Sequence, residues 1–544
     1  MIKKLTEISK FKDEYDICII GSGFAGAIAA HELGKSGKKV VVLEAGSKQR
    51  HYDDSDEMFN EATRMLHPSL KMNIRERDEF ERDRDRSTWD GQMFYPLGSM
   101  RFKTLGGSSH VWGGNSGRYT PSDFRLNSEH GVSVDWPITY DDLEEHYYKA
   151  EMEMGVSTLD DNPYIPRKRE TGYKLFPHSY SASIWLEKLK DYDDINLHYF
   201  SGNHRTAESI EGRSACENFR VCQACPIGAF YTADVHIQKA LGTGNVDFIL
   251  DANVSKLVEQ DGKISELLVK DRNFNEHKVS ADYFVLAAGG VENARLLLLS
   301  SNNKNPDGLS NRSGAVGRYF MEHLSFDATG QIKEVTHAKS TSWDHLTLAS
   351  SQFVNHANRD KATGFEMQFG GSGRNYIYVA FRDAGWGDLN KEHLVKNWEK
   401  YNNRLQIKFT FDMLPYADNR VSLDPYVKNV FGEPVPKVTF HGAREYENNG
   451  VALAHKISKK LFGRIGAKNL DLPRAGKARR HHIGTTRMGN NPDTSVVDRN
   501  GKSHEIDNLY IIGSSVHPTA GCSGVTLTLV ATTYLTMSHM ISRI

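Results

Sequence analysis

Two short apolar runs near the start of the chain, 17–20 and 40–43, enclose a segment with a helical pattern. The first run leads into GSGFAG (21–26), and the second ends at Glu44. Short apolar runs bounded by turn residues indicate buried strands. The pattern therefore predicts a β-α-β unit over residues 15–46.

The spacing of the glycines in this unit predicts a dinucleotide site. Gly21 allows a tight turn, Gly23 lets the backbone approach a pyrophosphate, and Gly26 lets the helix pack closely on the strand. At the end of the second strand, Glu44 is placed to accept a hydrogen bond from a ribose hydroxyl. A lone glycine-rich turn is common, but its place between two predicted strands makes the prediction specific.

Later segments extend the same pattern. Residues 105–114 carry four glycines among small hydroxyl side chains, which lets the backbone lie against a flat or charged group. Residues 246–291 predict a strand, a hairpin and a further strand of the first sheet, followed by a helix. Residues 508–526 predict a strand, a small-residue turn and the N-terminus of a helix that faces an anion or a dipole.

The remaining segments carry no phosphate-binding pattern. Residues 134–156 predict an amphipathic helix capped near Thr139. Residues 301–470 alternate strands with helical stretches, and we expect them to form the sheet of a substrate domain. The mixed-charge run 75–86 favours a solvated helix or loop over a partner-docking surface or an active-site lid.

Composition limits the classes of protein to consider. A chain of 544 residues needs two or more domains, and 68 basic against 69 acidic residues indicate no nucleic acid or anionic membrane as partner. No apolar run is long enough to span a bilayer, and residues 1–10 lack the hydrophobic stretch of a signal peptide. We therefore expect a cytoplasmic protein.

Five cysteines are too few for a disulfide scaffold, yet three of them, Cys216, Cys222 and Cys225, lie within ten residues. Three close thiolates suit an iron–sulfur cluster better than zinc, which usually takes four ligands. A disulfide with one free thiol, or three reduced thiols in a loop, are the alternatives.

Taken together, these segments resemble the glucose-methanol-choline (GMC) oxidoreductases, flavoenzymes that oxidise alcohols. The matching segments, in chain order, are GSGFAG with VVLEAG, LGGSSHVWGG, CPIGA (225–229), FVLAAGGVENARLLL, LPYADNRVSLD with FGEPVPKV, HHIGTTRMG and NLYIIGSSVHPT. The CPIGA segment resembles the branch that contains bacterial sugar and polyol dehydrogenases.

The resemblance implies an α/β fold in which a Rossmann-like FAD-binding domain is interleaved with a substrate domain built on an antiparallel sheet. The FAD-binding domain would comprise 1–50, 95–120, 205–300 and 474–544, and the substrate domain with its lid segments 51–94, 121–204 and 301–473. The implied FAD contacts are Gly21, Ser22, Gly23, Gly26, Glu44, Ala45, Gly107, Ser108, Trp112, Gly113, Val254, Ala288, Gly513, Ser514, Val525 and Thr526.

The family also implies chemistry at specific positions. His481 matches the histidine that accepts the alcohol proton while the carbinol carbon delivers hydride to flavin N5. The helix that begins near Val525 would direct its N-terminus at the flavin edge that gains negative charge. Where some members tether FAD through a histidine this chain has Val111, with His110 one place off, so we expect non-covalent FAD.

The second active-site position of the family aligns with Gly524, which has no side chain to bind the substrate oxygen. Ser523, His482 or His517 are the candidate replacements. The basic run Arg474, Lys477, Arg479 and Arg480 beside His481 would suit an anionic sugar, but a solvated face is the favoured interpretation.

The predicted activity is FAD-dependent oxidation of a hydroxyl of a small-molecule sugar, glycoside or polyol to a carbonyl. An oxygen-using oxidase, an FAD-containing lyase and a non-catalytic flavin-binding subunit are the alternatives. The CPIGA branch further implies a 3Fe-4S cluster on the three cysteines, which would pass electrons to a partner subunit; export with such a partner would place the chain in the periplasm.

Overall fold

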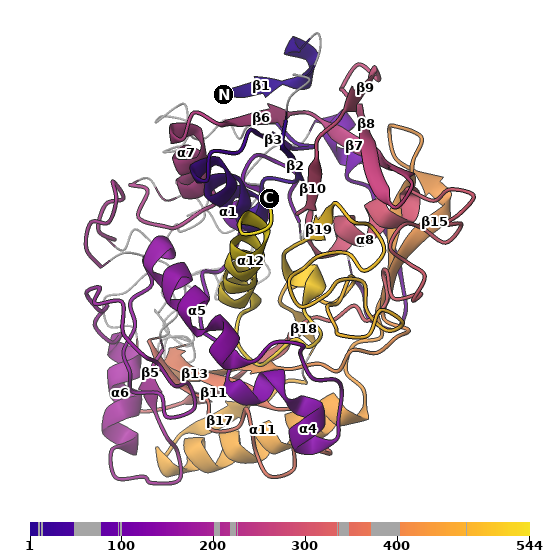
Figure 1. The fold of residues 1–544 in the computed structure, drawn as a ribbon. Coiled ribbons are helices and arrows are strands. Elements are labelled where there is room, and N and C mark those ends of the chain that lie inside the picture. The colour runs from indigo at the N-terminus through magenta and orange to yellow at the C-terminus, as the bar shows by residue number, and fades with distance from the viewer. Residues whose placement is uncertain are drawn as a thin grey trace, which may run out of the picture.

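The structure, a computed structural model, describes residues 1–8, 11, 15–47, 78–95, 97, 101–200, 207–217, 225, 227–334, 336, 347–371, 403–474 and 476–544. Figure 1 shows a parallel sheet with its helices in the upper half and an antiparallel sheet in the lower half, with the closing helix α12 running between them. The predicted α/β fold with two kinds of sheet is confirmed.

The first sheet is parallel, and its order is β1-β6-β3-β2-β10-β19. Its strands are β1 (Ile2–Lys4), β6 (Val246–Leu250), β3 (Val40–Leu43), β2 (Ile17–Ile20), β10 (Tyr283–Leu286) and β19 (Leu509–Ile511). Every residue of β2 and β3 is buried, because both faces of the sheet are covered. The predicted β-α-β unit is confirmed, with α1 (Phe24–Lys35) as its helix.

The two faces of this sheet pack on different partners. Ile17 and Ile19 face a core formed with α1, α7 (Asp234–Gly242) and α12 (Val525–Ile541). Cys18 and Ile20 face a core that includes the sheet of β7 (Asn253–Gln260), β8 (Lys263–Lys270) and β9 (Glu276–Val279), together with α8 (Gly289–Leu299). The hairpin, strand and helix expected over 246–291 are thus present.

The second sheet is antiparallel, with the order β17-β11-β14-β13-β12-β5 and β18 paired with β11. Its strands are β17 (Lys468–Asp471), β11 (Leu324–Gln331), β14 (Arg404–Phe411), β13 (Phe365–Gly371), β12 (Leu348–Ser350), β5 (His198–Tyr199) and β18 (Lys477–Ala478). Phe409, Phe411 and Phe365 pack on α6 (Tyr180–Leu189) and α11 (Glu445–Arg464). The intervening positions of β13 and β14 form the opposite face, which is polar.

Smaller elements complete the described chain. A third sheet contains β15 (Arg420–Lys428), β16 (Pro434–Thr439) and β4 (Thr88–Asp90), and the remaining helices are α3 (Glu79–Arg84), α4 (Leu126–His130) and α5 (Tyr140–Met154) with the 3-10 turns Leu5–Glu7, Gly107–His110, Pro121–Phe124 and Ser514–Val516. The predicted cap of α5 is confirmed, because the Thr139 side chain accepts from the backbone N–H of Asp142. No helix in these ranges combines the length and apolarity needed to cross a bilayer.

The strands follow the predicted division of the chain with one exception. Those of the parallel sheet come from 1–50, 205–300 and 474–544, and those of the antiparallel sheet come from 121–204 and 301–473 except for β18. The domain boundaries themselves stay a prediction.

The mixed-charge run 75–86 was predicted to be solvated, but several of its described side chains are buried. Residues 75–77 lie outside the described residues, but Glu81, Arg84 and Asp85 are only 2%, 3% and 6% exposed. The Arg84 guanidinium pairs with Asp85 at 2.8 Å and donates to the Ala45 carbonyl at 2.6 Å. A charge-dense sequence is usually solvated, but here neutralising partners allow α3 to pack on the end of β3.

Candidate functional site

A cavity of about 400 Å³ extends from the glycine turn after β2 to the polar face of the antiparallel sheet. Its walls contain all the predicted cofactor residues except Gly26. They are Gly21, Ser22, Gly23, Glu44, Ala45, Gly107, Ser108, Trp112, Gly113, Val254, Ala288, Gly513, Ser514, Val525 and Thr526. Segments nearly 500 residues apart in sequence therefore share one site.

The three glycines of the first turn have the distinct environments expected of them. Gly21 has φ +100°, and a Cβ there would lie 2.7 Å from the Ala287 carbonyl oxygen. A Cβ at Gly26 would lie 1.9 Å from the Gly21 carbonyl oxygen, so only glycine allows this contact of helix and strand. At Gly23 a Cβ would meet nothing within 4 Å, which leaves an open cradle before the N-terminus of α1.

Glu44 lies at the end of β3 and organises the neighbouring backbone. Its Oε2 accepts from the Ser22 amide at 3.1 Å and the Ser22 hydroxyl at 2.6 Å, and its Oε1 accepts from the Gly46 amide at 2.9 Å. The Gly106 amide in turn donates to Ser22 Oγ at 3.1 Å, which ties the second glycine-rich segment to the first. Burial raises the pKa of Glu44, while these hydrogen bonds act in the opposite direction.

Val111, at the position where the resemblance implies a tethering histidine in some members, lines the cavity. His110 does not line the cavity: its Nε2 lies 2.9 Å from the Leu105 carbonyl oxygen, and the side chain is 1% exposed. The residue at the tethering position thus has no nucleophilic atom, and the nearby histidine is directed elsewhere.

His481 lies at the other end of the cavity, where Glu322 holds its backbone. The Glu322 carboxylate accepts from the amides of His481 at 2.7 Å, Arg480 at 2.9 Å and His323 at 2.9 Å, and from the Tyr95 hydroxyl at 2.5 Å. Burial raises the pKa of Glu322 to about 7, while these four donors favour the ionised form. These bonds fix the backbone of Arg480 and His481 beside the segment that precedes β11.

A second histidine, His323, determines which nitrogen of His481 carries the proton. Its Nε2 lies 3.0 and 2.9 Å from the carbonyl oxygens of Ala520 and Gly521, which only accept, so Nε2 carries a hydrogen. Burial lowers the pKa of His323 to about 4, so the ring is neutral and its Nδ1 is an acceptor.

The Nδ1 atoms of the two rings are 2.6 Å apart, so the hydrogen between them belongs to His481. The Nε2 of His481 is therefore left unprotonated. Burial, and then His323, hold the pKa of His481 well below its usual value. A neutral imidazole with a bare nitrogen at a cavity wall can accept a proton.

Sequence reasoning did not identify Glu322 or His323. Both come directly before β11 and lie about 160 residues from His481 along the chain. The signal in the sequence was limited to two consecutive polar residues directly before the segment that forms β11.

Gly524 ends the loop before α12 with φ −61°, a conformation open to any residue. A Cβ there would lie 2.9 Å from the backbone oxygen of Asn115 and 3.0 Å from its Cγ and Oδ1. Asn115 lines the cavity, and its Oδ1 accepts from the Gly117 amide at 3.4 Å. The Asn115 side chain thus lies beside the position of the missing side chain, although no feature of the sequence pattern distinguished it from its neighbours.

Of the three predicted replacements for the missing side chain, only His482 lines the cavity. Its ring stacks on Phe320, and burial lowers its pKa to about 3. Ser523 is buried behind Gly117, where a Cβ would lie 2.3 Å from the Ser523 hydroxyl. His517 is buried with its Nε2 3.3 Å from Thr532 Oγ1. Neither Ser523 nor His517 lines the cavity, and their role as substrate contacts stays a prediction.

The residues of the basic run before His481 lie in different environments. Arg474 is exposed, Arg479 and Arg480 line the cavity, and the Lys477 side chain lies outside the described residues. The solvated interpretation is therefore wrong for Arg479, whose pKa burial lowers.

The iron–sulfur prediction gains no support. Cys222 lies outside the described residues, and Cys216 and Cys225 are partly exposed. Within the described ranges, no group of three His, Cys, Asp or Glu side chains is arranged to hold a metal ion.

Comparison with known proteins adds independent information. Residues 415–533 match the family model of GMC oxidoreductases, and residues 19–70 match a model of NAD(P)-binding Rossmann-like domains. The solved structure of pyridoxine 4-oxidase from Mesorbium loti has the same fold, with a TM-score of 0.62 at 18% identity, covering 97% of this chain and 99% of that one.

Two curated proteins are similar over nearly their whole length. The fructose dehydrogenase large subunit of Gluconobacter japonicus is 28% identical over 540 residues, which cover 95% of this chain and 96% of the relative. The 2-methyl-1,2-propanediol dehydrogenase of Mycolicibacterium austroafricanum is 28% identical over 542 residues, which cover 95% and 93%. Motifs, fold and these matches agree: the chain is similar to the GMC oxidoreductases, whose family model matches its residues 415–533.

Proposed function

We propose that this enzyme oxidises a hydroxyl of a sugar, glycoside or polyol to a carbonyl, with His481 as the base. The observation that carries the proposal is the histidine pair, which leaves a bare Nε2 on His481 at the cavity wall. When bound, FAD supplies the hydride acceptor for the carbinol carbon. His481 receives the hydroxyl proton, so the two hydrogens leave as hydride and proton.

The residues of the cavity fit FAD. The open cradle at Gly23 and the N-terminus of α1 suit a pyrophosphate, and Glu44 suits a ribose. The N-terminus of α12, at Val525 and Thr526, places unbonded amides and a positive helix end at the same cavity. Because Val111 occupies the tethering position, the proposed attachment is non-covalent.

The polar face of the antiparallel sheet supports a substrate with several hydroxyls. Glu366 and Gln368 of β13 are 3% and 1% exposed, and Lys408 and Thr410 of β14 line the cavity. Glu366 and Gln368 hydrogen-bond each other at 2.8 Å, but Lys408 faces the cavity, where an apolar alcohol would bury its ammonium without an acceptor, at a cost in free energy. The names of the two curated relatives, a fructose and a propanediol dehydrogenase, agree with a polyhydroxylated substrate.

The missing side chain at Gly524 need not leave the substrate oxygen without a donor. We assign that role to the Asn115 amide, since its Oδ1 is engaged by the Gly117 amide and the NH₂ group remains to donate. For the electron acceptor we propose a partner subunit, because one relative is named a large subunit.

Anaerobic bleaching of the flavin absorbance by a panel of sugars, glycosides and polyols tests the proposal. His481→Ala should retain FAD and lose roughly 100-fold or more in reduction rate, the usual scale for a positioned base. His482→Ala should lose less, because the His482 ring packs on Phe320 and does not share the proton of the pair. Peroxide formed in air would identify an oxidase; wild-type protein that no alcohol bleaches would leave a lyase or a non-catalytic subunit.

A further inference from the structure

The cavity carries an excess of positive charge. Six basic side chains line it against two acidic ones, Glu44 and Glu292. Three of the six, Arg101, Lys103 and Arg295, form ion pairs with Glu292, so each of them has a carboxylate partner. The other three, Lys408, Arg479 and Arg480, surround the end of the cavity that holds His481.

Lys408 projects from the middle of β14 on the polar face of the sheet. Its cross-strand neighbours are Asp327 of β11 and Gln368 of β13. Among the described residues no carboxylate lies within ion-pair distance of its ammonium, although the charges of Asp327 and Glu366 act on it. Asp327 interacts with another residue as well. Lys408 is thus a cavity-facing cation without a dedicated counterion.

Arg479 stands two residues before His481, held by a 3.2 Å hydrogen bond from its amide to the His323 carbonyl oxygen. Its Nε is buried and has no hydrogen-bond partner in the described part of the chain. A buried guanidinium donor without an acceptor is destabilising, and the fixed fork of arginine matches carboxylate and phosphate oxygens.

The two cations also act on each other. The charge of Arg479 lowers the pKa of Lys408, which burial together with this repulsion brings to about 7. Both side chains are partly buried, and holding two like charges together in such a wall is unfavourable unless an anion lies between them. The proposed pyrophosphate cradle at Gly23 belongs to the turn between β2 and α1 at the parallel sheet, whereas Lys408 belongs to β14 of the antiparallel sheet, so a different anion is needed.

We propose that Lys408 and Arg479 form an anion subsite, and that the preferred substrate is a polyhydroxylated alcohol bearing a carboxylate or a phosphate ester. This inference rests on the proposed function and names its substrate class. The anionic group would bind on the wall formed by β14 and the segment after β18, and its charge would orient the substrate toward His481 before reaction.

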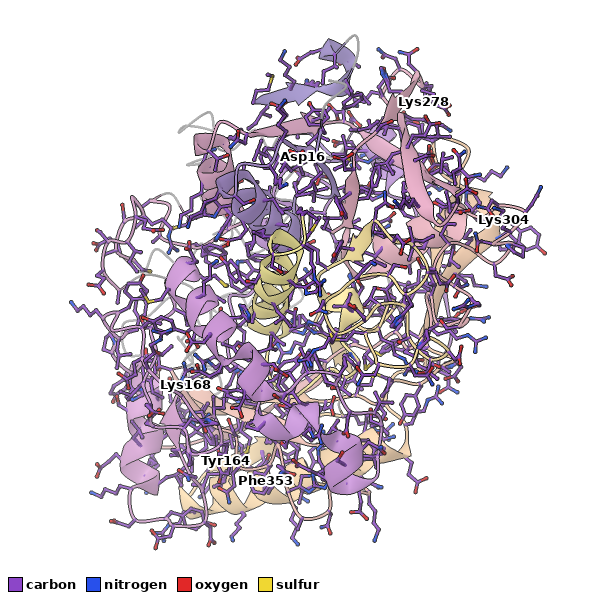
Figure 2. All side chains as sticks on the ribbon, in the orientation of Figure 1. Asp16, Tyr164, Lys168, Lys278, Lys304 and Phe353 are labelled. Carbon is purple, nitrogen blue, oxygen red and sulfur yellow. The ribbon has the colours of Figure 1, made fainter. Side chains whose placement is uncertain are left out.

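Matched substrate pairs test the subsite. D-Gluconate against D-glucitol differs by one carboxylate, and D-glucose 6-phosphate against D-glucose by one phosphate, so the two pairs also distinguish the two sources of charge. We expect the charged member of at least one pair to give a kcat/KM about 10-fold or more higher. Lys408→Met and Arg479→Leu should each reduce that ratio about 10-fold, whereas Lys304→Met, on the outer surface (Figure 2), should not change it.

Proton linkage gives a second readout. Because the pKa of Lys408 is lowered to about 7, its ammonium loses its proton as the pH rises from 6 to 9. The KM for the charged substrate should therefore rise over that range, while the KM for the matched neutral substrate should stay constant. Neutral substrates preferred in both pairs, with a ratio unchanged by Lys408→Met, would overturn the inference. If no alcohol reduced the flavin, calorimetric titration with D-gluconate and D-glucose 6-phosphate would still decide it: binding lost in Lys408→Met supports the subsite, and no binding refutes it.

Discussion

At the residue scale, the protonation of His481 depends on His323. The two bonds from His323 Nε2 to the carbonyls after Thr519 fix one ring, and the 2.6 Å contact between the Nδ1 atoms fixes the other. As the proposed base, His481 would need no carboxylate partner. Backbone carbonyl groups, which do not titrate, determine which of its nitrogens can accept a proton.

We expect His323→Phe to reduce kcat about 10- to 100-fold while FAD is retained, because His481 would then be free to place its hydrogen on either nitrogen. Since His323 helps to lower the pKa of His481, its removal should raise that pKa, so activity should fall off at a higher pH on the acid side. The pH profile of kcat/KM measures this shift, and selective ¹⁵N-histidine NMR reports the tautomer directly. His198→Phe, at another buried histidine, is the control; an unmoved profile in His323→Phe would show that His323 only fills space.

Gly524 and Asn115 form a pair whose substitutions should not be additive. Gly524→Asn alone should reduce activity about 10-fold or more, because its Cβ would lie 2.9–3.0 Å from Asn115 atoms. Asn115→Ala alone should lose the donor to the substrate oxygen. The double variant Gly524→Asn/Asn115→Ala removes the side-chain part of this crowding and supplies a new amide donor. Its kcat/KM should therefore be higher than that of Gly524→Asn alone. Strict additivity in the double-mutant cycle would argue against a shared role.

At the element scale, the turn between β2 and α1 separates folding from cofactor binding. Gly26→Ala should destabilise the protein with and without FAD, since its Cβ would overlap the Gly21 carbonyl oxygen at 1.9 Å. Gly23→Ala has open space around it and should leave the melting temperature of the FAD-free protein close to wild type. Because its methyl group would enter the cradle, the affinity for FAD should fall at least 10-fold. Thermal melts with and without FAD separate the two effects; equal behaviour of the two variants would contradict them.

The sequence predicted elements best where local rules and tertiary structure agree. The β-α-β unit, the capped helix α5 and the turn before α12 each carry glycine or capping signals at the positions that the fold uses. The burial of α3 could not be predicted, because it depends on partners that are distant in sequence. Arg84 donates to the Ala45 carbonyl, and Asp85 lies 3.9 Å from the Lys103 ammonium. Likewise, His323 and Asn115 contact the site only because the fold brings segments that are far apart in sequence together.

At the scale of the whole molecule, the cavity lies between two sheets and is lined by residues of both. FAD bound there should therefore stabilise the whole chain: at 100 times its dissociation constant, a ligand specific for the native state contributes about 2.7 kcal/mol. We expect one cooperative melting transition that rises in temperature as FAD is added. Two transitions, of which only one responds to FAD, would show that the two halves unfold separately.

Acid precipitation should release intact FAD into the supernatant, because Val111 offers no nucleophile at the tethering position. Absorbance spectra and chromatography of the supernatant and the pellet measure the partition. Val111→His is the informative comparison, since it restores the family's tethering residue. Flavin that stayed with the wild-type polypeptide would contradict non-covalent binding and direct attention to His110.

The antiparallel sheet presents alternate residues of β13 and β14 to different surroundings. Phe365, Met367 and Phe369 of β13 belong to the core, whereas Lys408 and Thr410 of β14 lie on the opposite face and line the cavity. Substitutions at the second set can therefore accumulate without disturbing the packing that holds the sheet on α6 and α11. A lineage built on this chain can change the alcohol it recognises one strand position at a time and keep its stability, which makes the sheet a favourable starting point for divergence and for directed evolution.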